Sequence, residues 1–472
     1  MPQNEKRLGR SGVTTQEQLI GVSPTRSYKN TWAISLLCLV QFIDVLGVTS
    51  ATTAIPAMLR GVGAPQSAAG MVVTAYAMFF GALLVLGARL GDKLGHRKVL
   101  IAGVVLFATV AVVGALSTDV WQLVAARSIQ GIAAAISVPS ALSLILHAAG
   151  TGPRRSTAIA AWSATGAAAG AAGFIVGGVL TQVFGWRAVF WINAPIGVLL
   201  LVGLVTVVPA LPPQNKAQKL DVLGALLLTV AVMAIVGGGS FIETPEARVH
   251  GIIAVLVGVG IGAGFFVHQR AADQPLIPPD AFRTASLRAG TVVSFANTAT
   301  TSSATVLATL FLQNELGVTP IEAGLSLLSF SLAVILGSVA SKPTLRAIAA
   351  NRAAGVGLGF IGIGNLVLAT TQGNWAGIIA GASLAGLGLG LSSVAGTALG
   401  TDVSASLTGS ASGILNTGAQ LGTALGVAIL VLVASPNNYG FLSAFAVAWT
   451  LAAFAALGTA TWIMTWRPPI RS

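Results

Sequence analysis

One acidic residue stands apart from the others because of its surroundings. The chain has 13 Asp and Glu residues, and all but Asp44 fall in polar segments or near the ends of apolar runs. Asp44 lies well inside the apolar run 32–59. Loss of hydration disfavours the charged form of a carboxyl group, whereas a nearby arginine favours it. A carboxyl group in this setting can bind and release a proton near neutral pH, so we predict that Asp44 carries protons.

Arg127 is the corresponding basic residue, within the apolar run 120–146. An arginine in such a run is costly unless it faces the protein interior and has a partner there. Gln130 follows three residues later and shares its helix face, and Gln41 has the same relation to Asp44. We predict that Gln41 orients Asp44. The alternative for Arg127 is a purely structural arginine, or one that extends toward an aqueous surface.

The elements that position these residues are long apolar runs. The chain is 54% hydrophobic and 8% charged with mean hydropathy +0.85, whereas soluble domains carry about 25% charged residues. Each run spans roughly 18 to 28 residues, enough to cross ~30 Å of hydrocarbon as a helix. We therefore predict an all-α polytopic membrane protein. Its fourteen helices are expected at 32–59, 69–89, 99–117, 120–146, 158–184, 188–211, 223–241, 251–268, 289–312, 323–341, 354–370, 376–398, 410–434 and 441–465.

The positions of Lys and Arg predict the orientation of these helices. With the N-terminus in the cytoplasm, only Arg60, Arg187 and Arg248 fall in outer loops, and Arg127 falls within a helix. All other Lys and Arg residues lie on the cytoplasmic side, as the positive-inside rule requires. We predict a multi-pass protein of the cell (cytoplasmic) membrane with both termini inside. The net charge of +12 then reflects topology and not binding to nucleic acid.

Composition also bounds the chemistry. The one cysteine, Cys38, lies in an apolar run, so cysteine can build neither a disulfide nor a thiolate metal site. The four histidines fall at helix ends or in loops, and no nucleotide-binding loop is present. We therefore expect no cofactor, no metal and no enzyme activity, and we expect a monomer. A membrane-embedded enzyme or a channel would need clustered catalytic residues or polar pore-lining helices.

Linker lengths divide the chain into five segments. The two longest cytoplasmic connections, about 212–222 and 269–288, flank two helices and separate six helices from six. Two six-helix halves around a site at the membrane midplane are typical of transporters. The expected segments are a disordered tail (1–30), an N-terminal six-helix bundle (31–211), two extra helices with linkers (212–288), a C-terminal six-helix bundle (289–466) and a cytoplasmic tail (467–472).

Two motifs identify a family. Residues 87–98 read GARLGDKLGHRK, which resembles the signature loop of the major facilitator superfamily, although Ala88 replaces the usual first glycine. The resemblance implies a gating loop in which Asp92 and Arg97 form a charge-relay clasp next to Gly95. The alternative is a basic loop that only fixes topology. The segment around Arg127 resembles the buried-arginine motif of the same superfamily.

A third motif resembles the fourteen-helix drug:proton antiporter family. It consists of a glycine-rich helix followed by FGWRAVFWINAPIG, and the C-terminal stretch 409–426 also looks like this family. Phe174 stands where the family has a proline, which is a departure from the antiporter pattern. The resemblance implies that helix glycines allow the gating movement; simple close packing is the alternative reading. The matching residues are Gly166, Gly170, Gly173, Gly177 and Gly178 in the helix and Trp186, Arg187, Asn193, Pro195 and Gly197 after it.

This resemblance implies a proton-coupled exporter of small, largely apolar drugs, antibiotics or natural products. It also makes the first and fourth helices neighbours, so Arg127 would modulate Asp44. The family usually has its aspartate at the position of Gly47, three residues later, and Asp44 could instead be a static partner of Arg127. The alternative function is a proton symporter or uniporter that imports a small nutrient.

Polar residues within the apolar helices are candidates for substrate binding. Their hydroxyl and amide groups could bind a substrate between apolar walls, and a tryptophan could stack on it. Serine and threonine in membrane helices also bond to their own backbone, which is the alternative role. The candidates are Gln41, Gln130, Trp162, Ser294, Asn297, Thr298, Thr301, Ser302, Asn416 and Gln420.

Overall fold

The computed structural model describes residues 24–150, 153–209, 212–213, 220–242, 247–273, 275–276, 284–372, 374–403, 408–434 and 443–466, and over these residues the chain is helical without strands. This confirms the predicted all-α class. The helices of the first half are α1 (Pro24–Gly61), α2 (Ala68–Leu94), α3 (His96–Ala115), α4 (Val120–Ala149), α5 (Pro153–Phe184), α6 (Ala188–Trp191) and α7 (Asn193–Val207). They are followed by α8 (Val222–Ile242), α9 (Arg248–Ala271), α11 (Ala285–Leu310), the π-helix η1 (Phe311–Glu315), α12 (Pro320–Ala347), α13 (Ala350–Thr370), α14 (Trp375–Gly400), α15 (Thr408–Val433) and α16 (Ala444–Thr465).

The helix count agrees with the expected fourteen spans. Thirteen helical segments of the described chain are long and apolar enough to cross a membrane, with α6 and α7 together as one of them. α11 is the remaining span, and its many Ser, Thr and Asn residues lower its hydropathy. α1 begins at Pro24, so residues 24–30 extend the first helix into the segment expected as a tail. The rest of that tail and residues 467–472 lie outside the described residues.

The sixth span runs through α6 and α7 with one irregular turn at Ile192, so the expected single span is confirmed. Ile192 keeps helical backbone angles, and its N–H donates to the Ala188 carbonyl at 3.0 Å. Pro195 lacks an N–H, so the helical hydrogen bond to the Trp191 carbonyl is missing there. In the same turn, the Asn193 side chain donates a hydrogen bond of 2.9 Å to the carbonyl of Val189. Asn193 is buried, so its amide side chain lies inside the first half of the molecule.

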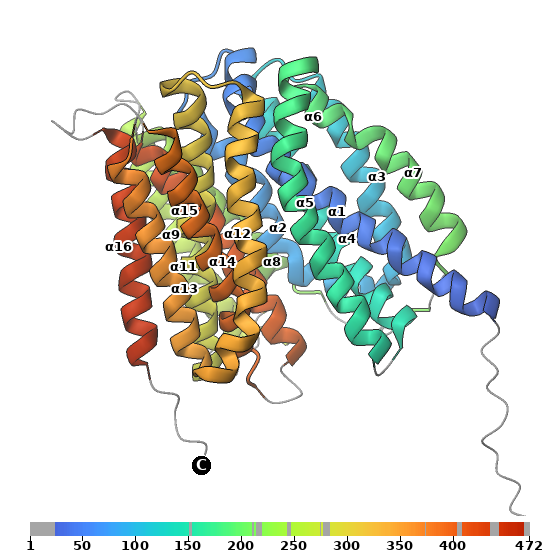
Figure 1. Ribbon diagram of the computed structural model, residues 1–472. Helices are drawn as coiled ribbons and strands as arrows, with labels where there is room; N and C mark the ends of the chain where they lie inside the picture. The colour runs from blue at the N-terminus through green and yellow to red at the C-terminus, as the bar shows by residue number, and fades with distance from the viewer. Residues whose placement is uncertain are drawn as a thin grey trace, which may run out of the picture.

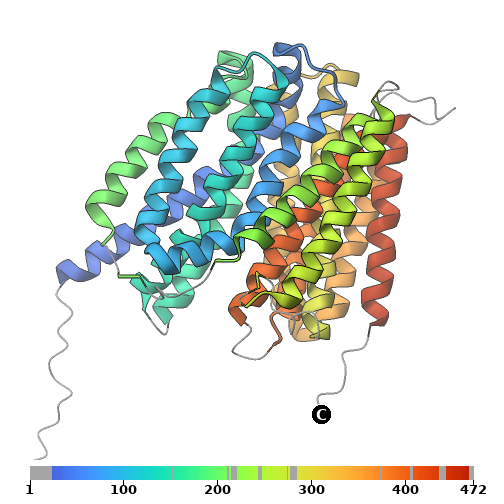
Figure 2. The same ribbon diagram turned by 180° about the vertical axis from the view of Figure 1, so that it is seen from behind.

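The helices form two bundles and a separate pair. α1–α7, the N-terminal half, pack on one another, and α11–α16, the C-terminal half, do the same. α8 and α9 pack mainly against each other, and α8 also contacts α2 and α15. Figure 2 shows this yellow-green pair beside the place where the two halves meet. The first residue of α1 and the last of α16 lie at the same end of the bundle (Figure 1).

The halves touch at their outer ends through glycines on α5 and α12. A Cβ atom on Gly178 would lie 2.5 Å from the carbonyl oxygen of Pro320, and one on Gly324 would lie 2.3 Å from that of Phe174. Only glycine allows backbones to approach this closely. In Figure 1 the two helices adjoin at the top and diverge toward the end where α1 begins. Since the charge pattern predicts that this end is cytoplasmic, α5 and α12 touch on the outer side and lie apart on the inner side, while α2 and α15 also join the halves, with Thr417 donating to the Gly81 carbonyl at 3.1 Å.

Hydrogen bonds between the halves support the same closure. The Gln313 side chain, in the π-helix η1, donates to the carbonyl of Thr53 at 2.8 Å. Arg60 donates to the Asn314 side chain at 3.2 Å, and the Gln182 side chain accepts from the backbone N–H of Ile321 at 3.2 Å. All three join segments at the outer ends of their helices. Opening of the outer side must therefore break these bonds.

Candidate functional site

Asp44 and Arg127 lie in the N-terminal half and are linked through a third residue, Tyr76. Asp44 is 8% exposed and Arg127 3%. The Tyr76 hydroxyl donates a hydrogen bond of 2.5 Å to Asp44 Oδ1, and the guanidinium carbon of Arg127 lies 4.9 Å from the centre of the Tyr76 ring. Among the described residues no ion pair within 4.0 Å joins Asp44 to Arg127. Tyr76 therefore lies between Asp44 and Arg127 and contacts both side chains.

Arg127 has further support from its own helix. Its guanidinium donates to the Gln130 side chain at 3.2 Å, so Gln130 orients Arg127 and is itself only 1% exposed. Close packing of α2 on α4 brings Tyr76 to this place, because a Cβ atom on Gly131 would lie 2.4 Å from the Tyr76 carbonyl oxygen. Sequence reasoning missed Tyr76. The available signal was a lone tyrosine within the apolar run 69–89.

A cavity of about 250 Å³ lies between the two halves, and we call it the central cavity. Its walls come from α1, α2 and α5 on one side and α11, α12, α14 and α15 on the other, with Phe174 and Phe330 as aromatic surfaces. No lining side chain is charged. The hydroxyl-bearing residues that line it are Thr49, Thr52, Thr301, Ser302, Thr305, Ser331 and Thr423.

The hydroxyl groups of the central cavity present mainly acceptors to its interior. Thr49 donates to the Val45 carbonyl at 3.0 Å, and Thr301 donates to that of Asn297 at 2.7 Å. Thr52 bonds to its own helix in the same way at 3.1 Å. Since the single hydroxyl proton is used within the helix, the lone pairs remain for a ligand. The cavity is thus apolar, uncharged and rich in hydrogen-bond acceptors.

A second cavity of about 300 Å³, the C-terminal cavity, lies between α11, α14 and α15. It contains four of the predicted substrate residues: Ser294, Asn297, Thr298 and Asn416. The Asn297 amide donates to Ser393 at 2.8 Å, and Thr298 donates to the Ala419 carbonyl at 2.5 Å. Two other predicted residues, Thr301 and Ser302, lie one turn farther along α11 and line the central cavity. The polar face of α11 therefore borders both cavities.

The remaining predicted substrate residues do not line the central cavity. Trp162 is buried in a hydrophobic cluster of the N-terminal half. Gln420 packs at the contact of α15 with α2, where a Cβ atom on Gly81 would lie 2.5 Å from it. Gln41 lies beside Gly166 of α5, 3.3 Å from its Cβ position, and no hydrogen bond joins it to Asp44 in the described structure. None of these three side chains lines the central or the C-terminal cavity, and their role in substrate binding stays a prediction.

The glycines of α5 face two different helices. A Cβ atom on Gly173 would lie 1.8 Å from the Thr49 hydroxyl, and one on Gly177 would lie 2.4 Å from the Ser50 carbonyl. Gly170 faces α1 as well, near Val45. Gly178, by contrast, faces α12 of the other half. The glycine series thus lets α5 approach α1 closely along its length and meet α12 at its outer end.

The signature loop holds its two charged residues apart. Gly95 has φ +98°, a conformation that favours glycine, and it separates α2 from α3. Asp92 contacts His96 Nε2 at 3.1 Å. Arg97 donates to the carbonyl of Val205 at 2.7 Å, at the C-terminal end of α7. The described part of the chain therefore shows no Asp92–Arg97 clasp.

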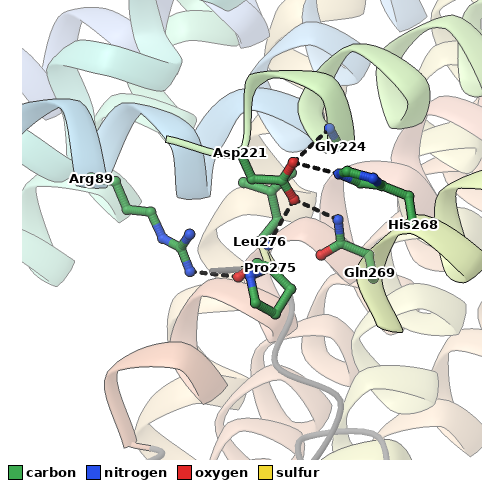
Figure 3. A network of polar contacts seen from close by, with 7 residues as sticks. All are labelled: Arg89, Asp221, Gly224, His268, Gln269, Pro275 and Leu276. Carbon is green, nitrogen blue, oxygen red and sulfur yellow. Dashed lines mark hydrogen bonds and ion pairs between the residues drawn. The ribbon is translucent and has the colours of Figure 1, made fainter. Parts of the chain in front are cut away.

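A polar network joins this end of α2 to the α8–α9 pair (Figure 3). Asp221, which precedes α8, accepts hydrogen bonds from His268 at 2.7 Å and Gln269 at 2.6 Å. It also accepts from the backbone N–H groups of Gly224 at 2.8 Å and Leu276 at 3.2 Å. Burial alone would raise the pKa of Asp221, but these four hydrogen bonds outweigh burial and hold it below the ordinary carboxyl value. Asp221 is therefore ionised at neutral pH.

Arg89 extends the network to the signature loop. Its side chain donates a hydrogen bond of 2.6 Å to the carbonyl of Pro275, next to Leu276, as Figure 3 shows. The segment after α9 is thus fixed both to α8, through Asp221, and to α2, through Arg89. The two extra helices carry no recognisable motif, and this network is what ties them to the N-terminal half at the cytoplasmic end.

Comparisons with curated proteins relate the chain to exporters. The chain is 31% identical to the cephamycin export protein of Amycolatopsis lactamdurans over 430 residues, which cover 87% of this chain and 86% of that protein. It is 29% identical to the lincomycin resistance protein of Streptomyces lincolnensis, with 94% and 93% covered. It is 28% identical to the multidrug efflux pump LfrA of Mycolicibacterium smegmatis, with 86% and 82% covered.

Solved structures with the same fold are also transporters. The POT family transporter PepTSo superposes with a TM-score of 0.68 at 15% identity, over 91% of this chain and 96% of that one. The nucleoside transporter NupG, as its D323A mutant, has a TM-score of 0.65 at 12% identity, over 92% and 99%. The sequence matches the Major Facilitator Superfamily over residues 37–269 and 289–472. With its membrane-spanning helices and this match, the chain belongs to the Major Facilitator Superfamily of transporters and is a multi-pass protein of the cell membrane.

Proposed function

We propose that this protein exports small, largely apolar drugs, antibiotics or natural products in exchange for protons, by alternating access. Support for export comes from relatives whose names describe cephamycin export, lincomycin resistance and multidrug efflux. The proposal includes no chemical conversion of the substrate, so the protein acts as a transporter and not as an enzyme. The structure, with its halves joined at the outer ends of α5 and α12, corresponds in this proposal to a state that is closed to the outside.

Support for proton coupling comes from one observation: the buried Asp44 lies next to the central cavity but does not line it. Val48, one helical turn from Asp44, does line it. Protonation of Asp44 removes a negative charge from the face of α1 that packs on Tyr76, and the neighbouring Arg127 then loses its counter-charge. The balance of charge within the N-terminal half changes, and this biases how α1 packs against the C-terminal half.

The energy available from this coupling is sufficient for export. One proton that crosses a potential of about 100 mV supplies ~2.3 kcal/mol. At 25 °C this corresponds to an accumulation of roughly fiftyfold. A single carboxyl group such as Asp44 therefore suffices, and we propose one proton per transport cycle. Loading of that proton from the outside favours release of the substrate.

The walls of the central cavity restrict the substrate class. Without a charged lining residue, the cavity offers no counter-charge to a dication. Its phenylalanines and aliphatic side chains favour apolar molecules, and its hydroxyl oxygens accept hydrogen bonds from hydroxyl or amine groups of a ligand. We therefore propose neutral, weakly anionic or monocationic substrates that carry hydrogen-bond donors.

Drug susceptibility tests the function. Cells that express the protein should tolerate higher concentrations of several neutral or monocationic antibiotics than cells with an empty vector, and cells that express Asp44→Asn should not. Undiminished transport of a dication dye by Asp44→Asn would contradict the proposed coupling. Counterflow in proteoliposomes under an imposed pH gradient tests the direction. Substrate uptake with protons, in place of exchange for protons, would indicate an importer.

A further inference from the structure

The sixth span contributes to the surroundings of Asp44. A small cavity of the N-terminal half, the Asp44 cavity, lies between α1, α3, α4 and α7. Its polar lining residues are Asp44, Ser137 on α4 and Asn193 on α7, and Gly197 forms part of the α7 wall. It shares no lining residue with the central cavity. Asn193 and Gly197 belong to the family-specific motif 184–197, to which the proposed function gives no role.

Asn193 has an unused hydrogen-bond acceptor in this cavity. The residue is 3% exposed, and its Nδ2 atom donates to the Val189 carbonyl one helical turn earlier. Its Oδ1 atom is buried and has no hydrogen-bond partner in the described structure. A buried amide oxygen without a partner costs free energy, and in proteins such atoms are usually satisfied by a bound water. The amide therefore points to a ligand in the cavity.

The size and chemistry of the cavity fit one water molecule. Its volume is about 20 Å³, and a water needs at least ~10–15 Å³ and two to four polar partners. A water there can donate one O–H to Asn193 Oδ1 and the other to the Asp44 carboxylate, and it can accept from the Ser137 hydroxyl. The hydroxyl makes only a long contact of 3.4 Å with the Ala134 carbonyl, so it is free to take this role.

We propose that Asn193 is a positioning residue of the proton site, which holds a water against Asp44 in a cavity that shares no lining residue with the central cavity. The inference rests on the proposed proton coupling at Asp44. The water supplies a second hydrogen-bond donor to the ionised carboxylate, beside Tyr76. It thus stabilises the charged state of Asp44 without contact between the carboxylate and the central cavity. This gives the motif asparagine a role in coupling.

Other groups around Asp44 are accounted for. The ionisable side chains that face it from neighbouring helices are Tyr76 on α2 and Arg127 on α4. α3 contributes the apolar Val104 and Phe107 to the cavity wall. The α5 residues that face α1 next to Asp44 include Gly166, Gly170 and Gly173. A change at Asn193 therefore acts on Asp44 through the cavity and not through another charge.

Titration of Asp44 in the purified full-length protein tests the proposal. Infrared difference spectra against Asp44→Asn isolate the carboxylic C=O band of Asp44, which is followed across pH without transport. Asn193→Leu removes the amide and fills the cavity, so the midpoint of the band should move up by about one pH unit. Asn193→Ser, which keeps a polar group and leaves room for water, should titrate near the wild type.

Two further variants keep the test decisive. Leu200→Ile changes the packing of the same cavity wall without a polar change and should leave the midpoint unmoved. Ser137→Ala removes only a hydroxyl and should move the midpoint upward by less than Asn193→Leu, which provides a readout if the latter does not fold. Equal midpoints in Asn193→Leu, Ser137→Ala and the wild type would overturn the role of Asn193 and leave Asp44 as proton carrier. Absence of a titrating Asp44 band in the wild type would overturn both proposals.

Discussion

The two buried carboxylates of the described chain, Asp44 and Asp221, have similar exposure, 8% and 9%, but opposite surroundings. Asp221 accepts four hydrogen bonds, two from side chains and two from backbone amides. Asp44 accepts one, from Tyr76. A carboxylate with many donors stays ionised, whereas a desolvated one with few donors can exchange a proton. Asp221 is therefore a fixed charge that holds α8 and α9 in place, whereas Asp44 is a charge that can switch.

Asp44→Asn should have the largest effect on transport. An amide cannot carry a proton, so accumulation driven by a pH gradient should fall from as much as roughly fiftyfold to none. Exchange of substrate across proteoliposomes without a gradient should persist, because the neutral side chain resembles the protonated state. Asp221→Asn serves as the matched control and should keep gradient-driven accumulation. Equal loss of gradient-driven accumulation in both variants would show that Asp44 and Asp221 do not differ in their role in proton coupling.

Asp221→Ala should have the largest effect on stability. It leaves buried donors, among them Gln269 at 2% exposure, without an acceptor, at a cost of about 2 kcal/mol. The melting temperature of the purified protein in detergent should fall by several degrees, whereas transport per folded molecule should change little. Asp119→Ala is the comparison, since Asp119 caps α4 near the surface, and its loss should cost only ~1 kcal/mol. A smaller loss for Asp221→Ala than for Asp119→Ala would show that the network is not structural.

Tyr76→Phe tests how the surroundings of Asp44 control its protonation. It removes the hydrogen bond to the carboxylate, so the group binds a proton more readily, and the pH profile of efflux should move upward by about one unit. Phe80→Leu is the control, because this neighbouring ring, 5.7 Å away between centroids, makes no hydrogen bond to Asp44. Identical profiles for Tyr76→Phe and wild type would mean that Tyr76 does not tune Asp44.

The pH dependence of stability should show the smallest effect. The pKa of Asp221 is lower in the folded protein than its ordinary value of about 3.9. Its contribution is therefore complete above that value and is lost as the pH falls through the lower, folded value. The difference in melting temperature between wild type and Asp221→Asn should stay constant near neutrality and shrink only below about pH 4. A difference that fades already near pH 6 would contradict the assignment.

Much of the fold could be predicted from the sequence because the membrane constrains it. Long apolar runs and the placement of Lys and Arg indicated fourteen spans, even for the polar α11. The irregular turn at Ile192 is a local effect of Pro195, and the span itself was predicted as one helix. The α8–α9 attachment could not be predicted, because His268 and Gln269 lie more than forty residues from Asp221 in the chain.

The sequence predicted the charged residues of the site but not the contacts that they make. Asp44 and Arg127 were found because charge inside an apolar run is rare. Tyr76 was missed because tyrosine is unremarkable in such a run, and its role depends on how closely α2 packs on α4 at Gly131. The Asp92–Arg97 pairing was expected from the resemblance, but in this structure Arg97 binds the end of α7. Motifs name residues that can interact, and the conformation decides which of them do.

Proton release on substrate binding tests the central claim most directly. Substrate is added to the purified protein in weakly buffered detergent near neutral pH, and a pH-sensitive dye records the protons released. Wild type and Asp221→Asn should release protons on substrate binding, with an upper limit of about one per molecule, and Asp44→Asn should release none. Equal release by Asp44→Asn and the wild type would contradict the assignment of Asp44 as the proton carrier.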